Sequence, residues 1–252
     1  MSLDKAKVAF FDFAGCEGCQ LTVLDALQTH PELLDVIEIV QFREAMSECT
    51  GNYDIAFVEG SCVWPSDEDR LMKIRERAQI VVALGACAHL GGVNAICNTA
   101  PPGEAAQIVY HEMASNYQTD SVRPIDRVIP IDAYLPGCPI DRTEFIQAVA
   151  ALLKGTFPRL PSDPVCVECK LRENQCLLLR GDICLGPITR AGCGAICPTF
   201  KVGCEGCRGM VPDANIDSLR QQMLEGGQSP EAFQSKLALF LTHELMIIDG
   251  SE

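Results

Sequence analysis

Residues 7–29 read KVAFFDFAGCEGCQLTVLDALQT, in which an apolar run, a glycine-flanked pair of cysteines and an amphipathic segment follow one another directly. The run at residues 7–13 is short and rich in phenylalanine, which predicts a β-strand. Residues 20–29 carry apolar side chains at helical spacing, which predicts a helix. The two cysteines of this C-x2-C pair, Cys16 and Cys19, are therefore expected in the loop between a first strand and a first helix.

The same alternation of strands and helices continues to residue 157. Further strands are expected where short runs are rich in valine, isoleucine or phenylalanine, at residues 36–42, 53–58, 79–84 and 127–131. Further helices are expected at residues 67–77, 104–116 and 141–154, the last with a start signal in Asp141. Strands that read as continuous apolar runs between helices indicate a parallel sheet covered on both faces. We therefore expect residues 1–157 to form a flavodoxin-like, doubly wound α/β domain.

A second domain is expected over residues 158–252. Residues 157–164 (FPRLPSDP) hold three prolines, which is typical of a linker. Residues 166–207 then hold eight cysteines with many glycines and little periodicity, so they cannot build an ordinary hydrophobic core. We expect a small, irregular, metal-stabilised domain with few helices, among them helices at residues 213–225 and 230–241.

The composition excludes several classes of partner. With 34 acidic and 20 basic residues the formal net charge is −14, which would repel nucleic acid and anionic membrane surfaces. No apolar stretch approaches the roughly 18 residues that a membrane-spanning helix needs, and the N-terminus lacks a signal-peptide pattern. We therefore expect a cytoplasmic protein without a membrane span. In that reducing compartment its 15 cysteines are expected to hold metal rather than to form disulfides.

The cysteines of the first domain follow predicted strands. Ligands of an open parallel sheet bind beyond the carboxyl ends of its strands, so these cysteines should converge on one edge. Five candidates compete there for the four positions of a four-thiolate site, and topology alone leaves the choice open: Cys16, Cys19, Cys62, Cys87 and Cys138.

The eight cysteines of the second domain suffice for two further four-thiolate sites, although their spacing alone does not divide them into sets. Zinc and iron–sulfur clusters both accept four thiolates. The block contains no histidine and its spacings match no common zinc ribbon, which favours iron–sulfur clusters. A zinc-stabilised interaction module is the alternative.

Taken together, these motifs resemble the small subunit of nickel–iron hydrogenases of the soluble, cytoplasmic, multisubunit type. The resemblance covers nearly the whole chain and rests on GCEGC at 15–19, VEGS at 58–61, GACAHLGG at 85–92, PGCP at 136–139 and the eight-cysteine block. The related cluster-bearing subunit of respiratory complex I resembles the chain less. It carries adjacent cysteines in place of the C-x2-C pair and lacks the eight-cysteine extension.

The resemblance implies three iron–sulfur clusters with four cysteine ligands each. The proximal cluster would take Cys16, Cys19, Cys87 and Cys138, leaving Cys62 out. The medial cluster would take Cys193, Cys197, Cys204 and Cys207. The distal cluster would take Cys166, Cys169, Cys176 and Cys184. Periplasmic relatives have a histidine and a proline where this chain has Cys166 and Cys197, so the resemblance implies that all three are 4Fe–4S clusters.

The resemblance also implies the function. Dihydrogen would be split at a nickel–iron site in a partner, the large subunit, and this chain would relay electrons between that site and a further flavin or iron–sulfur redox subunit. No catalytic residue is expected in this chain, because it has no second cysteine set for nickel. Nicotinamide, deazaflavin, heterodisulfide reductase and ferredoxin all stay open as the terminal acceptor.

Several residues near the predicted sites have no ligand role. Cys49, Cys62 and Cys97 are expected to be packing thiols in the core or at an interface, since free cysteine is among the most buried residue types. Glu17 and Glu59 lie in loops predicted to face the proximal cluster. A solvated or structural carboxylate is favoured for both, with proton relay or orientation of the loop backbone as the alternative.

Overall fold

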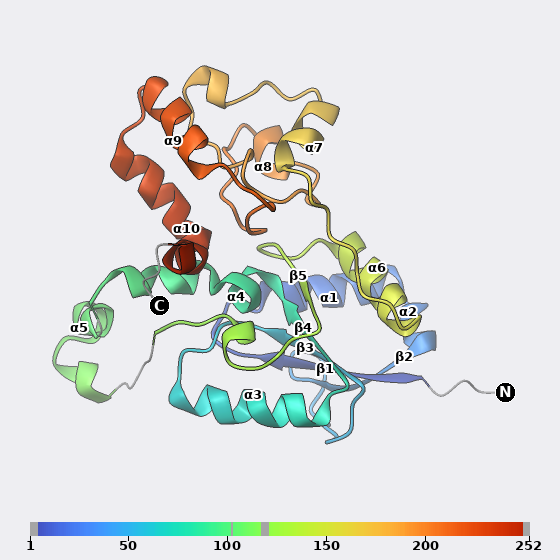
Figure 1. Ribbon diagram of the computed structural model, residues 1–252. Helices are drawn as coiled ribbons and strands as arrows, with labels where there is room; N and C mark the ends of the chain where they lie inside the picture. Colours follow the sequence, from blue (N-terminus) through green and yellow to red (C-terminus); the bar gives the residue numbers. More distant parts are fainter. Residues whose placement is uncertain (1–4, 102, 117–120, 249–252) are drawn as a thin grey trace. The chain divides into compact units, whose positions relative to one another are not determined.

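A parallel sheet lies at the centre of the first of two units into which the chain divides, residues 1–158 and 159–252. The computed structural model describes residues 5–101, 103–116 and 121–248. Within these residues the sheet has five strands in the order β2-β1-β3-β4-β5, all paired in parallel (Figure 1). The strands are β1 (Ala6–Asp12), β2 (Ile37–Phe42), β3 (Ile55–Glu59), β4 (Ile80–Leu84) and β5 (Ala133–Leu135). This order is that of a flavodoxin-like fold and confirms the predicted α/β architecture.

Helices cover both faces of the sheet, because alternate residues of each strand point to opposite sides. On one face α1 and α6 pack against side chains such as Phe10 and Phe57, whereas on the other α3 packs against Phe11 and Val58 (Figure 1). The α-helices of this unit are α1 (Gly18–Thr29), α2 (Leu33–Val36), α3 (Pro65–Arg77), α4 (Gly85–Leu90), α5 (Glu104–Tyr110) and α6 (Arg142–Leu153). Its 3-10 turns are η1 (Gly92–Thr99), η2 (His111–Asn116) and η3 (Ile125–Arg127).

The prediction of a strand at residues 127–131 is wrong. Most of that stretch is irregular after η3, and the fifth strand begins only at Ala133. Pro130 lies inside the run and has no N–H group to donate to a neighbouring strand. Ile129 is 3 % exposed and packs with the α3 side of the core, so the apolar character of the run serves packing rather than strand pairing.

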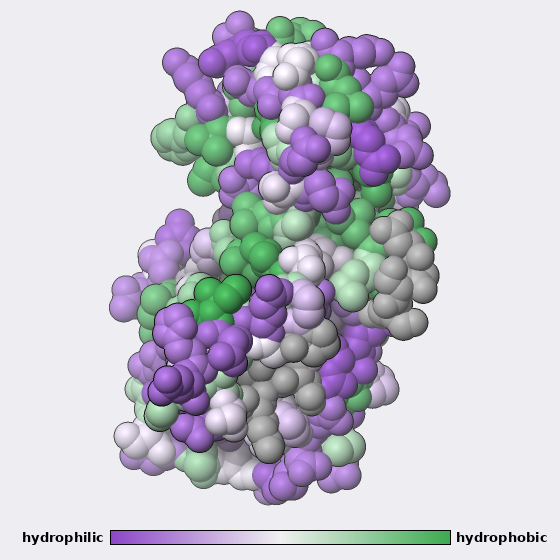
Figure 2. All heavy atoms as spheres, turned by 90° about the vertical axis from the view of Figure 1, so that its left-hand side faces the viewer, coloured by the Kyte–Doolittle hydropathy of each residue, from purple (hydrophilic) through white to green (hydrophobic). Residues whose placement is uncertain are grey.

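The helix expected at residues 104–116 is divided. It ends as α5 at Tyr110, because His111 has a φ of 49° in the left-handed region, and the 3-10 turn η2 follows. α5 buries none of its residues, and Ile108 and Val109 are 65 % and 64 % exposed. Figure 2 views this side of the molecule and shows hydrophobic residues at the surface among hydrophilic ones. The predicted start of α6 is confirmed, since the Asp141 carboxylate accepts a hydrogen bond from the Glu144 N–H at 2.9 Å.

The second unit has short elements around its cysteines and two longer helices after them. The elements are α7 (Val165–Leu171), η4 (Leu178–Arg180), α8 (Ile196–Thr199), α9 (Ile216–Glu225) and α10 (Pro230–Ile248). α10 packs on the cysteine-rich segment through buried Leu241, and its Lys236 forms an ion pair with Glu205 at 2.8 Å. Among the described residues, no helix combines the length and the hydrophobicity required to cross a membrane.

We expect Phe57→Ala to lower the free energy of unfolding by about 3–5 kcal/mol, because it opens a cavity between sheet and helices. The Phe57 ring is 1 % exposed and its centroid lies 5.2 Å from that of Phe10 and 5.5 Å from that of Phe145. Urea unfolding followed by circular dichroism measures the change. The matched control is Phe157→Ala at a 54 % exposed ring, expected to change the value by less than about 0.5 kcal/mol. Equal effects of the two variants would contradict the packing described here.

Candidate metal centres

The carboxyl ends of four neighbouring strands lie level with one another. Asp12 at the end of β1 is in register with Glu59 of β3, and Glu59 is in register with Leu84 of β4. Leu84 is in turn in register with Leu135 of β5. Loops that leave this edge bring together residues that are far apart in the sequence, as predicted. Four of the predicted ligands follow within a few residues: Cys16 and Cys19 after β1, Cys87 after β4 and Cys138 after β5.

The pKa values of these thiols show that the four are electrostatic neighbours. Burial and, to a smaller extent, the thiolate charges of Cys138 and Cys16 together raise the pKa of Cys87 to about 12. Burial also raises the pKa of Cys19, with further contributions from Glu59, Cys87 and Cys138. Thiols held this closely are difficult to ionise on their own, whereas a bound metal deprotonates its thiol ligands. The arrangement therefore suits a metal centre.

Glycines bring the backbone close to the sulfur atoms. A Cβ at Gly85, whose φ is +85°, would lie 2.3 Å from the Cys19 Sγ. A Cβ at Gly92 would lie 2.9 Å from the Cys87 Sγ. Real Cβ atoms essentially never make contacts this short, so glycine at these positions lets the backbone pack directly against the two sulfur atoms. Backbone held close to its ligands fits a metal centre that is bound by thiolates.

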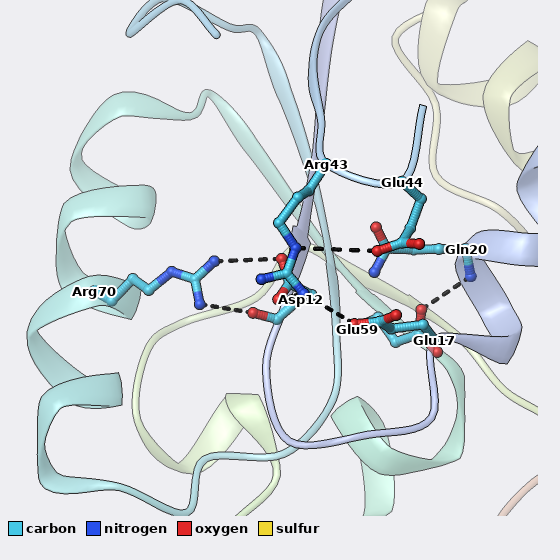
Figure 3. Close-up of polar contacts among 7 residues, drawn as sticks. All are labelled: Asp12, Glu17, Gln20, Arg43, Glu44, Glu59 and Arg70. Atoms are coloured by element: carbon cyan, nitrogen blue, oxygen red, sulfur yellow. Dashed lines mark hydrogen bonds and ion pairs between the residues drawn. The ribbon is translucent and has the colours of Figure 1, made fainter. Parts of the chain in front are cut away.

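Glu59 holds the C-x2-C loop in place. Its carboxylate is 4 % exposed and accepts hydrogen bonds from the N–H groups of Cys19 at 3.0 Å and Gln20 at 2.9 Å. These groups belong to the first turn of α1, whose N-cap residue Glu17 makes no capping hydrogen bond of its own. Burial raises the pKa of Glu59, although the two backbone hydrogen bonds lower it. Glu59 thus caps α1 from the neighbouring strand and orients the backbone of the cysteine loop, which is the alternative role and not the favoured one (Figure 3).

A network of charged side chains surrounds the outer side of this loop (Figure 3). Arg43 lies between Asp12 and Glu17, with Nη2 at 3.0 Å from a carboxylate oxygen of each. Arg70 adds a hydrogen bond to the backbone carbonyl of Asp12 at 2.7 Å. Arg43 is largely exposed, so its ion pairs contribute little to stability.

The three remaining cysteines differ in their surroundings. Cys62 is 0 % exposed and packs with the α3 side of the core, which confirms its prediction as a packing thiol. Cys49 and Cys97 are exposed, so neither packs in the core, and a place at an interface stays a prediction for both. Both stand in irregular or 3-10 segments beyond the strands, where burial does not follow from residue type. His89, next to the proximal set, stacks on Tyr134 with ring centroids 3.7 Å apart.

In the second unit, four thiols form one electrostatic group. Burial and, to a smaller extent, the thiolate charges of Cys184, Cys169 and Cys176 together raise the pKa of Cys166 to about 11. Burial likewise raises the pKa of Cys184, with contributions from Cys169 and Cys176. The members of this group come from α7 and from the irregular segment that follows it.

The other four cysteines form two pairs next to this group. Burial and the charge of Cys193 raise the pKa of Cys197. Burial raises the pKa of Cys204 to about 12, with smaller contributions from Cys184 and Cys207. The Cys204 N–H also donates to the Cys184 Sγ at 3.3 Å, so the two sets of thiols adjoin at this point.

The described residues contain no group of three or more histidine, cysteine, aspartate or glutamate side chains arranged to hold a single metal ion.

The chain is similar in sequence to one protein family and to subunits of known hydrogenases. Residues 16–152 match the model of the NADH ubiquinone oxidoreductase 20 kDa subunit family. Sulfhydrogenase 2 subunit delta of Pyrococcus furiosus is 35 % identical over 221 residues, covering 87 % of this chain and 92 % of the relative. The iron–sulfur subunit of the F420-non-reducing hydrogenase of Archaeoglobus profundus is 27 % identical over 273 residues, covering 85 % of each chain. A crystal structure of an NAD+-reducing [NiFe]-hydrogenase in its H2-reduced state contains a similar chain, with 27 % identity and a TM-score of 0.55 over 62 % of this chain and 96 % of that one.

We expect Glu59→Ala to loosen the C-x2-C loop, because it leaves two buried N–H groups without an acceptor at a cost of about 1–3 kcal/mol each. Hydrogen–deuterium exchange of peptides that contain Cys19 and Gln20 should become at least tenfold faster. The control is Glu17→Gln, which removes only an exposed ion pair with Arg43. Exchange that is unchanged in Glu59→Ala, or equally fast in both variants, would refute the capping role.

Proposed function

Because the chain belongs to the NADH ubiquinone oxidoreductase 20 kDa subunit family, and within it to the small subunits of nickel–iron hydrogenases, we propose that it relays electrons through three 4Fe–4S clusters. The electrons travel between the nickel–iron site of a large subunit and a further flavin or iron–sulfur redox subunit. The observation that carries this proposal is that three loops converge at the carboxyl edge of the sheet and carry thiols that affect one another's pKa values.

The first unit carries the proximal cluster in this proposal, on Cys16, Cys19, Cys87 and Cys138. The mutual effects of these thiols on their pKa values support the set. So does the contact between the loops after β4 and β5, in which the Ala86 N–H donates to the Gly137 carbonyl at 2.8 Å. Cys62 is left out, because it packs in the core on the α3 side of the sheet.

The second unit carries the other two clusters in this proposal. The distal set, Cys166, Cys169, Cys176 and Cys184, is supported by the electrostatic coupling of all four thiols. The medial set, Cys193, Cys197, Cys204 and Cys207, is supported by the coupling within its two pairs. Each set has four thiolates, enough for a complete four-iron cluster.

When bound, each cluster would accept one electron and pass it on. The chain itself supplies the thiolates, buries some of them, and donates the Cys204 N–H to the Cys184 Sγ. Glu59 keeps the proximal loop in one conformation, so that the loop does not have to rearrange when the charge of the cluster changes. The hydrogen bond from Cys204 to the Cys184 Sγ joins the medial and distal sets through a short, direct contact.

The large subunit covers the carboxyl edge of the sheet in this proposal. Cys16 and Cys138 are exposed there, as is the side chain of Leu21 at 56 %, so a partner would shield the proximal centre from water. The complex operates in the cytoplasm in this proposal, where thiols stay reduced and available for cluster binding.

Metal analysis tests the assignment. In the complex purified without oxygen, we expect about twelve irons and twelve sulfides per copy of this chain, four of each for every cluster. Cys138→Ser should remove about four irons together with the proximal electron paramagnetic resonance signal. The control, Cys97→Ser, replaces an exposed thiol outside all three sets and should keep all the iron. Stoichiometric zinc without sulfide would refute the proposal in favour of the zinc-stabilised module.

The glycine beside Cys19 offers a test that leaves every ligand in place. In Gly85→Ala the new methyl group would lie 2.3 Å from the Cys19 Sγ, so we expect loss of about four irons per chain. Gly103→Ala is the matched control, because its φ of +80° is also left-handed but no atom lies within 4 Å of the new Cβ. It should cost about 1 kcal/mol of backbone strain and no iron. Full iron content in Gly85→Ala would contradict the proximal assignment.

A further inference from the structure

A buried arginine lies among the cysteines of the second unit. Arg208 directly follows Cys207 and is 1 % exposed, and it is among the largest fully buried side chains of the described residues. A guanidinium group stays charged in proteins, and taking it out of water costs free energy unless its surroundings compensate. In a chain with a net charge of −14, a cation buried beside cysteine ligands therefore indicates a specific role.

Arg208 braces two segments that carry cysteines of the proposed medial set. Its Nε donates a hydrogen bond to the Ala191 carbonyl at 2.8 Å. Its guanidinium lies so close to Gly192 that a Cβ there would be 2.2 Å from Nη2 and 2.8 Å from Cζ. Gly192 precedes Cys193 in the chain, so the positive charge is held between the backbone next to Cys193 and the backbone next to Cys207.

The loop that Arg208 contacts is held from a second side as well. The Glu168 carboxylate accepts hydrogen bonds from the N–H groups of Gly192 at 2.9 Å and Ala195 at 3.2 Å. Two buried or half-buried charged groups therefore hold the backbone on both sides of Cys193, which keeps the Arg208 guanidinium next to this loop. A fixed charge in a water-poor interior acts more strongly than one at the surface.

We propose that Arg208 is the positioning residue whose buried positive charge raises the reduction potential of the medial cluster. The inference rests on the proposed function, since it assumes a cluster on Cys193, Cys197, Cys204 and Cys207. Reduction adds one negative charge to a centre that already carries four thiolates. A cation held nearby stabilises the reduced form relative to the oxidised form, and net charge is one of the factors that set cluster potentials. The medial centre would thus accept electrons more readily than its all-thiolate ligation alone allows.

The test compares three variants in the complex purified without oxygen. Arg208→Gln removes the charge, Arg208→Lys keeps it, and Arg220→Gln removes an exposed charge from α9 of the same unit. Each is titrated with reductant and followed by electron paramagnetic resonance, with iron counted per chain. The medial signal is identified as the one that Cys204→Ser alters.

At a fixed ambient potential, Arg208→Gln should lower the ratio of reduced to oxidised medial cluster at least tenfold, a shift of about 59 mV for a one-electron couple. Arg208→Lys and Arg220→Gln should stay within threefold of the wild type. An unchanged ratio of reduced to oxidised medial cluster in Arg208→Gln, or an equal shift in Arg208→Lys, overturns the inference. The proposed function stands in either case if the wild type contains about twelve irons per chain.

If Arg208→Gln loses iron, the lysine variant becomes the test of the electrostatic role. A full iron content in Arg208→Lys, with a wild-type ratio of reduced to oxidised medial cluster, supports the role of the charge. Loss of the medial cluster in the lysine variant as well would show that the guanidinium acts only as a brace, and it would overturn the electrostatic role. A wild type without iron or sulfide would refute the proposed function itself.

Discussion

The register of the parallel sheet is the constraint on which the proximal site depends. Backbone hydrogen bonds between neighbouring strands keep Asp12, Glu59, Leu84 and Leu135 level at one edge. The loops that start from this row bring together Cys19, Cys87 and Cys138, although more than a hundred residues separate the first from the last. The core on both faces of the sheet maintains that register, because a slip of one residue would turn every buried side chain toward the wrong face.

The two units hold their thiols by different means. In the first unit, a hydrophobic core positions the strands, and Glu59 at the end of a strand fixes the cysteine loop through two backbone hydrogen bonds. In the second unit, the cysteine segment has little regular structure, and charged side chains hold its backbone in place. Arg208 and Glu168 bind the backbone around Cys193, and Lys236 of α10 binds Glu205 between two further cysteines. Both units thus use charged side chains, fixed against the backbone, to hold flexible cysteine loops in one arrangement.

Much of the fold could be predicted from local patterns, since four of the five strands coincide with apolar runs between helices. The fifth strand was missed because a longer apolar run around Ile129 lies just before it and supplies the core instead. The cysteines after the strands could be predicted as one group, because the carboxyl ends of parallel strands lie at the same edge of the sheet. The exposure of Cys49 and Cys97 could not be predicted, because residue type predicts burial only on average, and the two lie in an irregular segment and in the 3-10 turn η1.

By itself, the sequence determined the alternation of strands and helices, the position of the cysteines at strand ends and the resemblance to hydrogenase small subunits. These are properties of local spacing and residue type. Only the tertiary structure decided that Cys62 turns into the core, that Glu59 caps a helix from another strand, and that Arg208 is buried beside Cys193. The physical reason is that each of these depends on which side of a strand or loop a residue faces and on what packs there. Such contacts join residues far apart in the chain, and no local pattern records them.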